Sequence, residues 1–281
     1  MTLNLNEVKK HIAAALLEDI GTGDVSTLCC IDSAATNRAK LIAKEEGVLC
    51  GVEIAKMVFE TVDADIDFEA FKTDGERLQK GDVIFLVSGK ARSILEAERT
   101  ALNYIQRLSG IATQTAEYVQ LIADTGVRIL DTRKTTPTMR MMEKYAVKTG
   151  GGCNHRIGLY DMIMLKDNHI DFAGGITNAI NKARNLTSVT TTWKVEIEVR
   201  DLTELKTVLE TGNVDRIMLD NFDVETISEA VKMIDGRYEI EVSGGINKSN
   251  IRDYALSGVD YISVGALTHN IKALDLSLIQ A

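Results

Sequence analysis

Two carboxylates share one face of a short apolar segment. Alternate side chains of a β-strand point to opposite faces, so Glu196 and Glu198 of the segment VEIEV lie together, opposite three aliphatic residues. Strands of a parallel barrel are buried on both faces, and an unpaired buried charge is costly. We therefore expect both glutamates to have cationic partners. An edge strand with one solvent-exposed face is the alternative.

The next apolar segment, RIMLD, also ends in a carboxylate, Asp220. Enzymes built on α/β barrels carry their catalytic groups at the carboxyl ends of the strands. Glu198 and Asp220 are therefore candidate catalytic residues. A metal could bridge these carboxylates to a bound phosphate, and Mg²⁺ with few protein ligands fits such a site best.

Cationic residues follow the ends of other apolar segments: Arg133, Lys134, His155, Arg156 and Lys166. Such a set suits a substrate with several anionic groups, because arginine forms bidentate contacts with carboxylate and phosphate. For Lys166 taken alone, the alternative is a side chain that lies along apolar surface and keeps its ammonium in water.

Small residues follow the last two apolar segments, in the sequences VSGGIN and SVGALT. They are Ser243, Gly244, Gly245 and Gly265. Small residues leave backbone N–H groups accessible, and the loops after the final strands of a barrel commonly bind phosphate. The residues together indicate a barrel enzyme that binds a phosphorylated substrate and a second anion.

The elements that position these residues alternate between short strands and helices. Six apolar segments end in polar or glycine residues: VRILDTRK, DMIMLKDN, KVEIEVR, DRIMLDN, YEIEVSGG and DYISVGA. Helical patterns follow most of them, which predicts parallel strands closed as a barrel, with one or two further strands near 140–158. An open doubly wound sheet is the alternative, but no G-x-G-x-x-G follows a strand.

The first part of the chain has a different pattern. We expect a first helix capped by Asn6, a loop over EDIGTGDVST, and a small, partly antiparallel sheet over 38–89. A helical region from 91 to 124 is expected to divide at Gly110. We place the domain boundary there, giving domains 1–110 and 111–266.

Composition limits the possible partners. The 281 residues carry a formal net charge of −9 and only 5% aromatic residues, which argues against nucleic acid and anionic membranes. No apolar run approaches the roughly 20 residues of a membrane span. The four cysteines have no C-x-x-C spacing, and the N-terminal segment does not read as a signal peptide, so we expect a cytoplasmic protein with reduced thiols.

Seven motifs, in order, make the sequence specific: EDIGTGDVST, ERTALNYIQRLSGIAT, DTRKTTP, KTGGGCNHRIGLYDMIMLKDNHI, VEIEV, LDNF and SGGI. From Glu18 to Ala281 the chain resembles the quinolinate phosphoribosyltransferases, the carboxylating nicotinate-nucleotide pyrophosphorylases. The resemblance implies an N-terminal α/β open sandwich, against which the tail 267–281 packs, and an incomplete, seven-stranded α/β barrel. Thr138 and Met139 depart from the pattern, since many members carry glycine and leucine there.

The resemblance also implies an activity. Members are pentosyltransferases that join quinolinate to phosphoribosyl pyrophosphate (PRPP) with Mg²⁺, giving nicotinate mononucleotide, pyrophosphate and CO₂ for NAD biosynthesis. They form at least dimers, and the residue matching Arg99 reaches the neighbouring subunit's site. The matching substrate-binding residues here are Arg99, Arg133, Lys134, His155, Arg156, Lys166, Glu198 and Asp220. Lys134, Glu198 and Asp220 would be catalytic, and Ser243, Gly244, Gly245 and Gly265 would bind phosphate.

Three other functions remain open. The chain could be a paralogue in the family that acts on a different substrate, or a non-catalytic binder of phosphorylated sugars. It could also be an aldolase-type barrel with Lys166 as a Schiff-base lysine, although that role requires a lowered lysine pKa. The full cationic set argues against all three.

Overall fold

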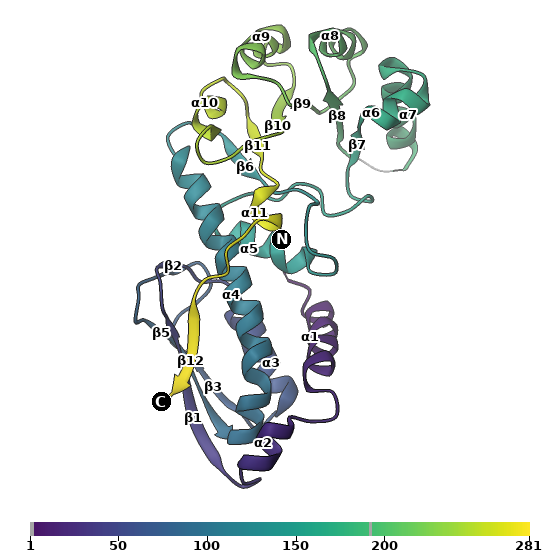
Figure 1. Ribbon diagram of the computed structural model, residues 1–281. Helices are drawn as coiled ribbons and strands as arrows, with labels where there is room; N and C mark the ends of the chain where they lie inside the picture. Colours follow the sequence, from purple (N-terminus) through teal and green to yellow (C-terminus); the bar gives the residue numbers. More distant parts are fainter. Residues whose placement is uncertain (1–2, 191–192) are drawn as a thin grey trace. The chain divides into compact units, whose positions relative to one another are not determined.

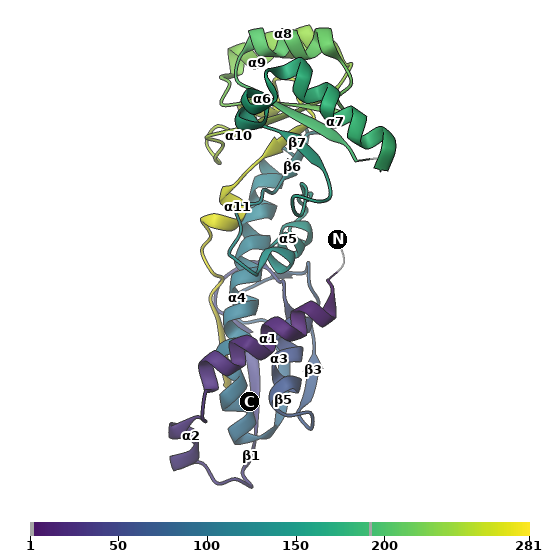
Figure 2. The same cartoon turned by 90° about the vertical axis from the view of Figure 1, so that its right-hand side faces the viewer.

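The computed structural model describes residues 3–190 and 193–281, and the chain divides into two compact units. Figures 1 and 2 show the elements of both. The first unit contains Met1–Ala116, Thr135–Gly151 and Leu267–Ala281, and the second contains Glu117–Lys134 and Gly152–Ala266. Within the described residues, no helix is long and apolar enough to cross a membrane.

The first unit is built around a four-stranded antiparallel sheet. Its order is β12 (Leu276–Gln280), β1 (Thr36–Ala43), β5 (Val83–Lys90) and β3 (Asp67–Ala70). The prediction of a small antiparallel sheet is confirmed, and the tail supplies an edge strand to it. A second, two-stranded sheet pairs β2 (Gly47–Val48) with β4 (Arg77–Leu78).

Two helices precede the sheet in the chain. In α1 (Leu5–Ile20) the cap is Asn4, whose side chain accepts a hydrogen bond from the Asn6 N–H, so the prediction of Asn6 as the cap is wrong by two residues. The predicted loop contains a short helix, α2 (Val25–Cys30), because the Asp24 carboxylate caps it by accepting from the N–H groups of residues 26 and 27.

Two further helices of this unit were not predicted from the sequence. Helix α3 (Val52–Val62) packs beside α1, and α5 (Arg140–Thr149) occupies most of the segment in which extra strands were expected. The expectation of strands over 140–149 is therefore wrong. Thr138, just before α5, has a φ of 67°, which is strained for a β-branched residue. Glycine would adopt this conformation without strain.

Helix α4 (Ala91–Leu121) runs through Gly110 without a break, so the predicted division is wrong. Gly110 permits a close approach instead, since a Cβ there would lie 2.2 Å from the carbonyl oxygen of Lys272. The tail packs against the helix at this point, with the Leu274 N–H donating to the carbonyl of Gln106. The predicted boundary at 110 lies inside the helix, and the compact units divide at 116/117.

The second unit contains six parallel strands, all of them predicted from the sequence. In sheet order they are β6 (Arg128–Leu130), β11 (Tyr261–Ser263), β10 (Glu239–Ser243), β9 (Arg216–Asp220), β8 (Val195–Val199) and β7 (Ile163–Leu165). Neighbouring strands are consecutive in the chain, except that the first, β6, pairs with the last, β11. With β6 and β7 at its two edges, the sheet is not closed, but it lacks the reversal of strand order that is typical of a doubly wound sheet.

Helices connect these strands and lie on one side of them, as Figures 1 and 2 show. They are α6 (Asp167–Ala173), α7 (Ile176–Thr190), α8 (Leu202–Thr211), α9 (Val224–Ile234) and α10 (Ile251–Ala255), and α11 (Ala266–His269) follows β11. Helices α7, α8 and α9 pack side by side. Cys153 adds a single parallel bridge to Leu130 of β6.

Candidate active site at the carboxyl edge of the parallel sheet

The parallel sheet places most of the predicted residues at one edge, because all its strands end on the same side. Lys166 follows β7, Asp220 ends β9, and Ser243 ends β10 directly opposite Asp220 in the ladder. Glu198 lies one residue before the end of β8, and Gly265 follows β11. These five residues of the second unit therefore lie along one edge of the sheet.

Lys166 is the partner of Glu198. Its ammonium contacts the Glu198 carboxylate directly, with the lysine side chain 40% exposed and the glutamate side chain 11% exposed. Strand β8 lies between β7 and β9, so it is no edge strand, and the alternative of a solvent-exposed face is wrong. The alternative for Lys166 also fails, since its charge is paired with an acid and does not simply extend into water.

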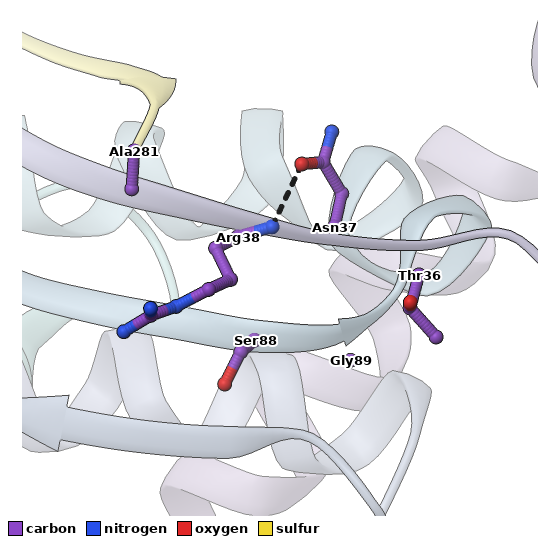
Figure 3. A pocket seen from close by; sticks show the side chains of 6 residues that line it. All are labelled: Thr36, Asn37, Arg38, Ser88, Gly89 and Ala281. Carbon is purple, nitrogen blue, oxygen red and sulfur yellow. Dashed lines mark hydrogen bonds between the residues drawn. The ribbon is translucent and has the colours of Figure 1, made fainter.

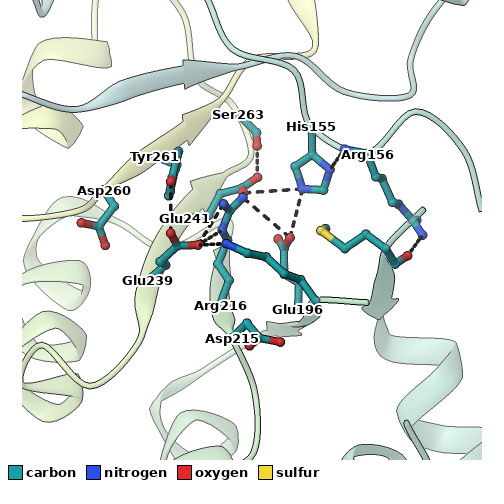
Figure 4. A network of polar contacts seen from close by, with 12 residues as sticks. His155, Arg156, Glu196, Asp215, Arg216, Glu239, Glu241, Asp260, Tyr261 and Ser263 are labelled. Atoms are coloured by element: carbon teal, nitrogen blue, oxygen red, sulfur yellow. Dashed lines mark hydrogen bonds and ion pairs between the residues drawn. The ribbon is translucent and has the colours of Figure 1, made fainter. Parts of the chain in front are cut away.

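Glu196 is fully buried and has a different cationic partner. Its Oε2 lies 3.1 Å from Nε2 of His155 and 3.9 Å from the Arg216 guanidinium. Arg216 also contacts the buried Glu241, at 2.8 Å, and Nε2 of His155 lies 3.5 Å from that carboxylate. Figure 4 shows this network. The prediction of cationic partners is therefore confirmed for both glutamates.

Sequence reasoning missed Glu241 and Arg216, although a signal was present. The segment EIEV occurs in β8 as residues 196–199 and again in β10 as residues 239–242. The alternation that places Glu196 and Glu198 on one face does the same for Glu239 and Glu241. Glu239 bonds to Arg216 at 3.1 Å, and the Arg216 guanidinium stacks 4.0 Å from the Tyr261 ring.

The electrostatics of this network follow from its burial. Burial raises the pKa of Glu241 to about 7, and the neighbouring charge of Glu196 adds to this, against the opposing effects of His155, Ser263 and Arg216. Burial lowers the pKa of His155, but the hydrogen bond to Glu196 and the charges of both glutamates outweigh it and raise the pKa overall.

His155 and Arg156 are held by a buried acid after β6. Asp131 accepts a hydrogen bond from the His155 N–H at 2.8 Å and another from the Asn154 side chain at 2.7 Å. Arg156 is half-buried, and burial together with the positive charge of Arg133 lowers its pKa. The two guanidinium groups are thus close enough to repel each other, as expected of a site for a polyanion.

Lys134 and Arg133 are exposed residues of the loop after β6, where the Lys134 N–H donates to Thr132 Oγ1 at 3.0 Å. Arg99 is an exposed residue of α4 and belongs to the first unit. All other predicted site residues belong to the second unit.

The predicted phosphate-binding glycines adopt backbone conformations that favour glycine. Gly244 has a φ of 101° and Gly245 a φ of 63°. Gly244 packs against Asn221, because a Cβ on it would lie 2.1 Å from the Asn221 side-chain oxygen. Asn221 in turn donates to the Asp220 carboxylate at 2.7 Å and, through its N–H, to the Ser243 carbonyl at 2.9 Å. Asn221 therefore links the acidic residue to the glycine loop.

Hollows are present within each unit. One of about 410 Å³ is formed by the loops after β8 and β9 and is lined by residues that include Arg200, Asn221 and Asp223. The other, of about 540 Å³, lies in the first unit between the ends of β1, β5 and the C-terminal residue (Figure 3). Neither is lined by a predicted site residue.

Comparison with known families and proteins gives consistent results. The family models described as quinolinate phosphoribosyl transferase, N-terminal domain and C-terminal domain, match residues 24–109 and 111–279. A rice protein named nicotinate-nucleotide pyrophosphorylase [carboxylating], chloroplastic, is 46% identical, over 97% of this chain and 77% of its own. A probable enzyme of the same name from Bacillus subtilis (strain 168) is 43% identical, over 98% and 94%.

Solved structures resemble the fold closely. NadC from Streptococcus pyogenes has a TM-score of 0.94 and 42% identity, covering 100% of this chain and 99% of that chain. A nicotinate-nucleotide pyrophosphorylase from Francisella tularensis has a TM-score of 0.93 and 44% identity, covering 99% and 97%.

Proposed function

The chain belongs to the quinolinate phosphoribosyltransferase family, and on this basis we propose that it transfers the phosphoribosyl group of PRPP to quinolinate. The products are nicotinate mononucleotide, pyrophosphate and CO₂, so the enzyme is a pentosyltransferase of NAD biosynthesis. The observation that carries this proposal is the convergence of Lys166, Glu198, Asp220 and Ser243 at one edge of the parallel sheet, within the segment that matches the family.

Quinolinate is a ring acid with two carboxylates, and the cationic residues suit it. Arg133, Lys134, His155, Arg156 and Lys166 bind the substrate anions, with Arg99 of the partner subunit completing the set in a homodimer or larger oligomer. The lowering of the pKa of Arg156 by the charge of Arg133 supports this role, because two neighbouring guanidinium groups favour a bound dianion.

The Lys166–Glu198 ion pair suggests how binding leads to chemistry. A substrate carboxylate that approaches Lys166 competes with Glu198 for the ammonium, and Glu198 then becomes available to the ribose. As pyrophosphate leaves, the ribose carbon develops positive charge, which Glu198 and Asp220 stabilise. Lys134 is the third catalytic residue in this proposal.

The pyridine nitrogen is the nucleophile, so no protein nucleophile is required. The cations hold the ring beside the ribose, and the attack becomes effectively intramolecular. Once alkylated, the nitrogen carries a positive charge that stabilises the carbanion left when the adjacent carboxylate departs as CO₂. The protein contributes mainly desolvation to that step.

The backbone N–H groups of Gly244, Gly245 and Gly265, with the Ser243 hydroxyl, bind the phosphate. The open space around the Cβ position of Gly245 supports this role, because a ligand can approach the backbone closely where there is no side chain.

The carboxylates at this edge fit Mg²⁺ chemically, since it prefers hard oxygen ligands and few of them from protein. Glu198 and Asp220 would hold it, together with phosphate oxygens of the substrate. When bound, Mg²⁺ would neutralise charge on the departing pyrophosphate. Glu198 is bonded to Lys166 and Asp220 to Asn221, so these two contacts would have to break or rearrange when the ion binds.

The finer features of the fold also belong to this proposal. Cys153 bridges to β6 on the side away from β11, so a short seventh strand there would give the incomplete barrel of the family. Four free cysteines suit a reducing compartment, and we propose that the protein works in the cytoplasm.

The test is an assay of the purified protein with PRPP and either quinolinate or nicotinate. We expect CO₂ and pyrophosphate in equal amounts from quinolinate, and a far slower reaction with nicotinate, which lacks the second carboxylate. Equal rates with both acids would indicate a paralogue that uses another substrate. Binding of PRPP without turnover would indicate a sugar-phosphate binder, and borohydride trapping at Lys166 an aldolase.

A further inference from the structure

A buried charged network lies one layer of side chains further into the sheet than the proposed site. Glu196 and Glu241 precede Glu198 and Ser243 by two residues, so each pair shares a face of its strand. Arg216 lies in the ladder between the two, opposite Glu196 on β8 and Glu239 on β10. None of the steps proposed above uses Glu196, Glu241 or Arg216.

The stability of the fold does not by itself explain why this network consists of charged residues. Buried ion pairs contribute little net stability, because the cost of desolvation offsets their attraction. Glu196 and Glu241 are both fully buried, and Oε1 of Glu196 has no hydrogen-bond partner among the described residues. Buried groups with perturbed pKa values cluster at functional sites.

The network ends on the His155 ring and uses both of its nitrogens. Nδ1 accepts a hydrogen bond from the Arg156 N–H at 2.7 Å, and Nε2 lies 3.1 Å from Glu196 and 3.5 Å from Glu241. In this conformation the ring therefore carries its proton on Nε2 and donates it to the carboxylates. A histidine whose second nitrogen bonds to a carboxylate is fixed in tautomer and ring orientation.

A metal ion could in principle occupy the same place, since one ligand atom each from His155, Glu196 and Glu241 lie within 4.8 Å of one another. The Arg216 guanidinium already supplies the positive charge there, 2.8 Å from Glu241 and 3.9 Å from Glu196. A cation is therefore already present between the two carboxylates.

We propose that Glu196 and Glu241 are positioning residues: they orient the His155 ring, which fixes the Arg156 backbone and so places the Arg156 guanidinium for a substrate carboxylate. This inference rests on the proposed function. It extends that function by assigning substrate orientation to two buried acids that lie two residues before the strand-end residues Glu198 and Ser243.

The test compares Glu241→Gln and Glu196→Gln with Glu239→Gln. Glu239 is a matched control, because it bonds to the same Arg216 but has Tyr261 and Lys194 as its other partners in place of His155. We expect the KM for quinolinate to rise about 10-fold or more in the first two variants, as when outer partners of a ligating histidine are removed. In these two variants the KM for PRPP should change less than about 2-fold. In Glu239→Gln the same limit should hold for the KM of either substrate.

Imidazole nitrogen NMR supplies a readout that does not depend on turnover. The chain has four histidines, and the His155 signals are identified by their loss in His155→Gln. We expect an Nε2–H tautomer with a protected proton in the native protein and in Glu239→Gln, and its loss in Glu241→Gln and Glu196→Gln. If either glutamine variant fails to fold, Ser263→Ala removes only the hydroxyl that bonds to Glu241 and should change the signal in the same direction.

The two readouts separate the possible failures. A native His155 without the protected Nε2–H, or a KM for quinolinate that rises equally in Glu239→Gln, would overturn the positioning role. If no chain turns quinolinate over while the tautomer changes as expected, the proposed function fails and the orientation of His155 by the two acids stands.

Discussion

Glu198 is the residue for which we propose two successive roles, an ion pair with Lys166 before substrate binds and catalysis afterwards. It is mostly buried, its side-chain partner among the described residues is Lys166, and the neighbouring strand is β9, which ends in Asp220. A carboxylate in this position is paired while the site is empty, so its burial does not leave an isolated charge. Binding of an anion to Lys166 would release it toward the developing positive charge.

Replacing either acid should therefore affect turnover and not folding. We expect Glu198→Ala and Asp220→Ala each to lower kcat by about 100-fold or more, as when a preorganised electrostatic group is removed. Circular dichroism and the unfolding temperature should stay near the native values. Glu210→Ala, at an exposed position of α8, serves as the control and should keep native turnover. Near-native kcat in both acid variants would remove them from the mechanism.

At the level of elements, the residues that follow β9 and β10 have backbone conformations that few residue types adopt. Asn221 has a φ of 57° and fits between Asp220 and Gly244, so the ends of β9 and β10 are joined through one side chain. This arrangement requires glycine at 244 for two reasons, its φ of 101° and the contact with Asn221. The acid and the phosphate-binding loop are thereby kept in register.

Gly244→Ala should raise the KM for PRPP by about 10-fold or more and lower the free energy of unfolding by about 1–3 kcal/mol, from backbone strain and overpacking. Gly236→Ala is the matched control, since Gly236 also has a positive φ, of 68°, but has open space around its Cβ position. In Gly236→Ala the free energy of unfolding should fall by the backbone strain alone. The double variant Gly244→Ala/Asn221→Ala should recover part of the lost stability, and full additivity would contradict the proposed contact.

The elements also show what the sequence could reveal. All six strands of the parallel sheet were predicted, because each is a short apolar run that ends in polar residues or glycine. The break predicted at Gly110 was wrong because a glycine that admits the distant Lys272 carbonyl looks the same as one that ends a helix. Helix α3 was missed inside a region that was interpreted as strands throughout.

For the site, too, the sequence revealed local properties but not long-range ones. Glu198, Asp220 and Lys166 could be found from their places at strand ends, which are local properties. Glu241 and Arg216 depend on which strands are neighbours, since their partners come from β8, β9 and the loop that carries His155. Strand order is a long-range property, so single residues of the sequence do not display it.

For the whole molecule, burial of charge makes stability depend on pH. The pKa of Glu241 is raised by burial to about 7 from its usual 4.5. A folded chain that binds more protons than the unfolded chain loses stability as pH rises, here between about 4.5 and 7. Glutamine at 241 cannot titrate, so the unfolding free energy of the native protein minus that of Glu241→Gln should fall over this range and level off above it.

Denaturant unfolding from pH 4 to 8 measures this difference. Glu239→Gln is the control of opposite sign. Burial opposes the shift, but hydrogen bonding to Arg216 and its charge lower the pKa of Glu239, so its contribution is lost only as pH falls below about 4.5. Parallel curves for the native protein and Glu241→Gln would show that Glu241 does not titrate in this range.

Assembly is a second property of the whole molecule. If Arg99 acts in the partner's site, Arg99→Ala and Lys134→Ala chains should each be inactive, and mixing them should restore activity. A hybrid dimer would contain one site with both residues intact, so up to about a quarter of native activity is expected after random subunit exchange. No recovery, with exchange demonstrated by mass spectrometry, would mean that each chain uses its own Arg99.

The most direct measurement is a crystal structure of the protein with quinolinate and a non-reactive PRPP analogue bound. We predict that the quinolinate carboxylates contact Arg133, Arg156 and Lys166, that Lys166 has moved away from Glu198, and that a phosphate lies against Gly244 and Gly245. Ligands bound in another place, such as the hollow beside Arg38 and Ala281, with the Lys166–Glu198 pair unchanged, would contradict a single site at the carboxyl edge of the sheet.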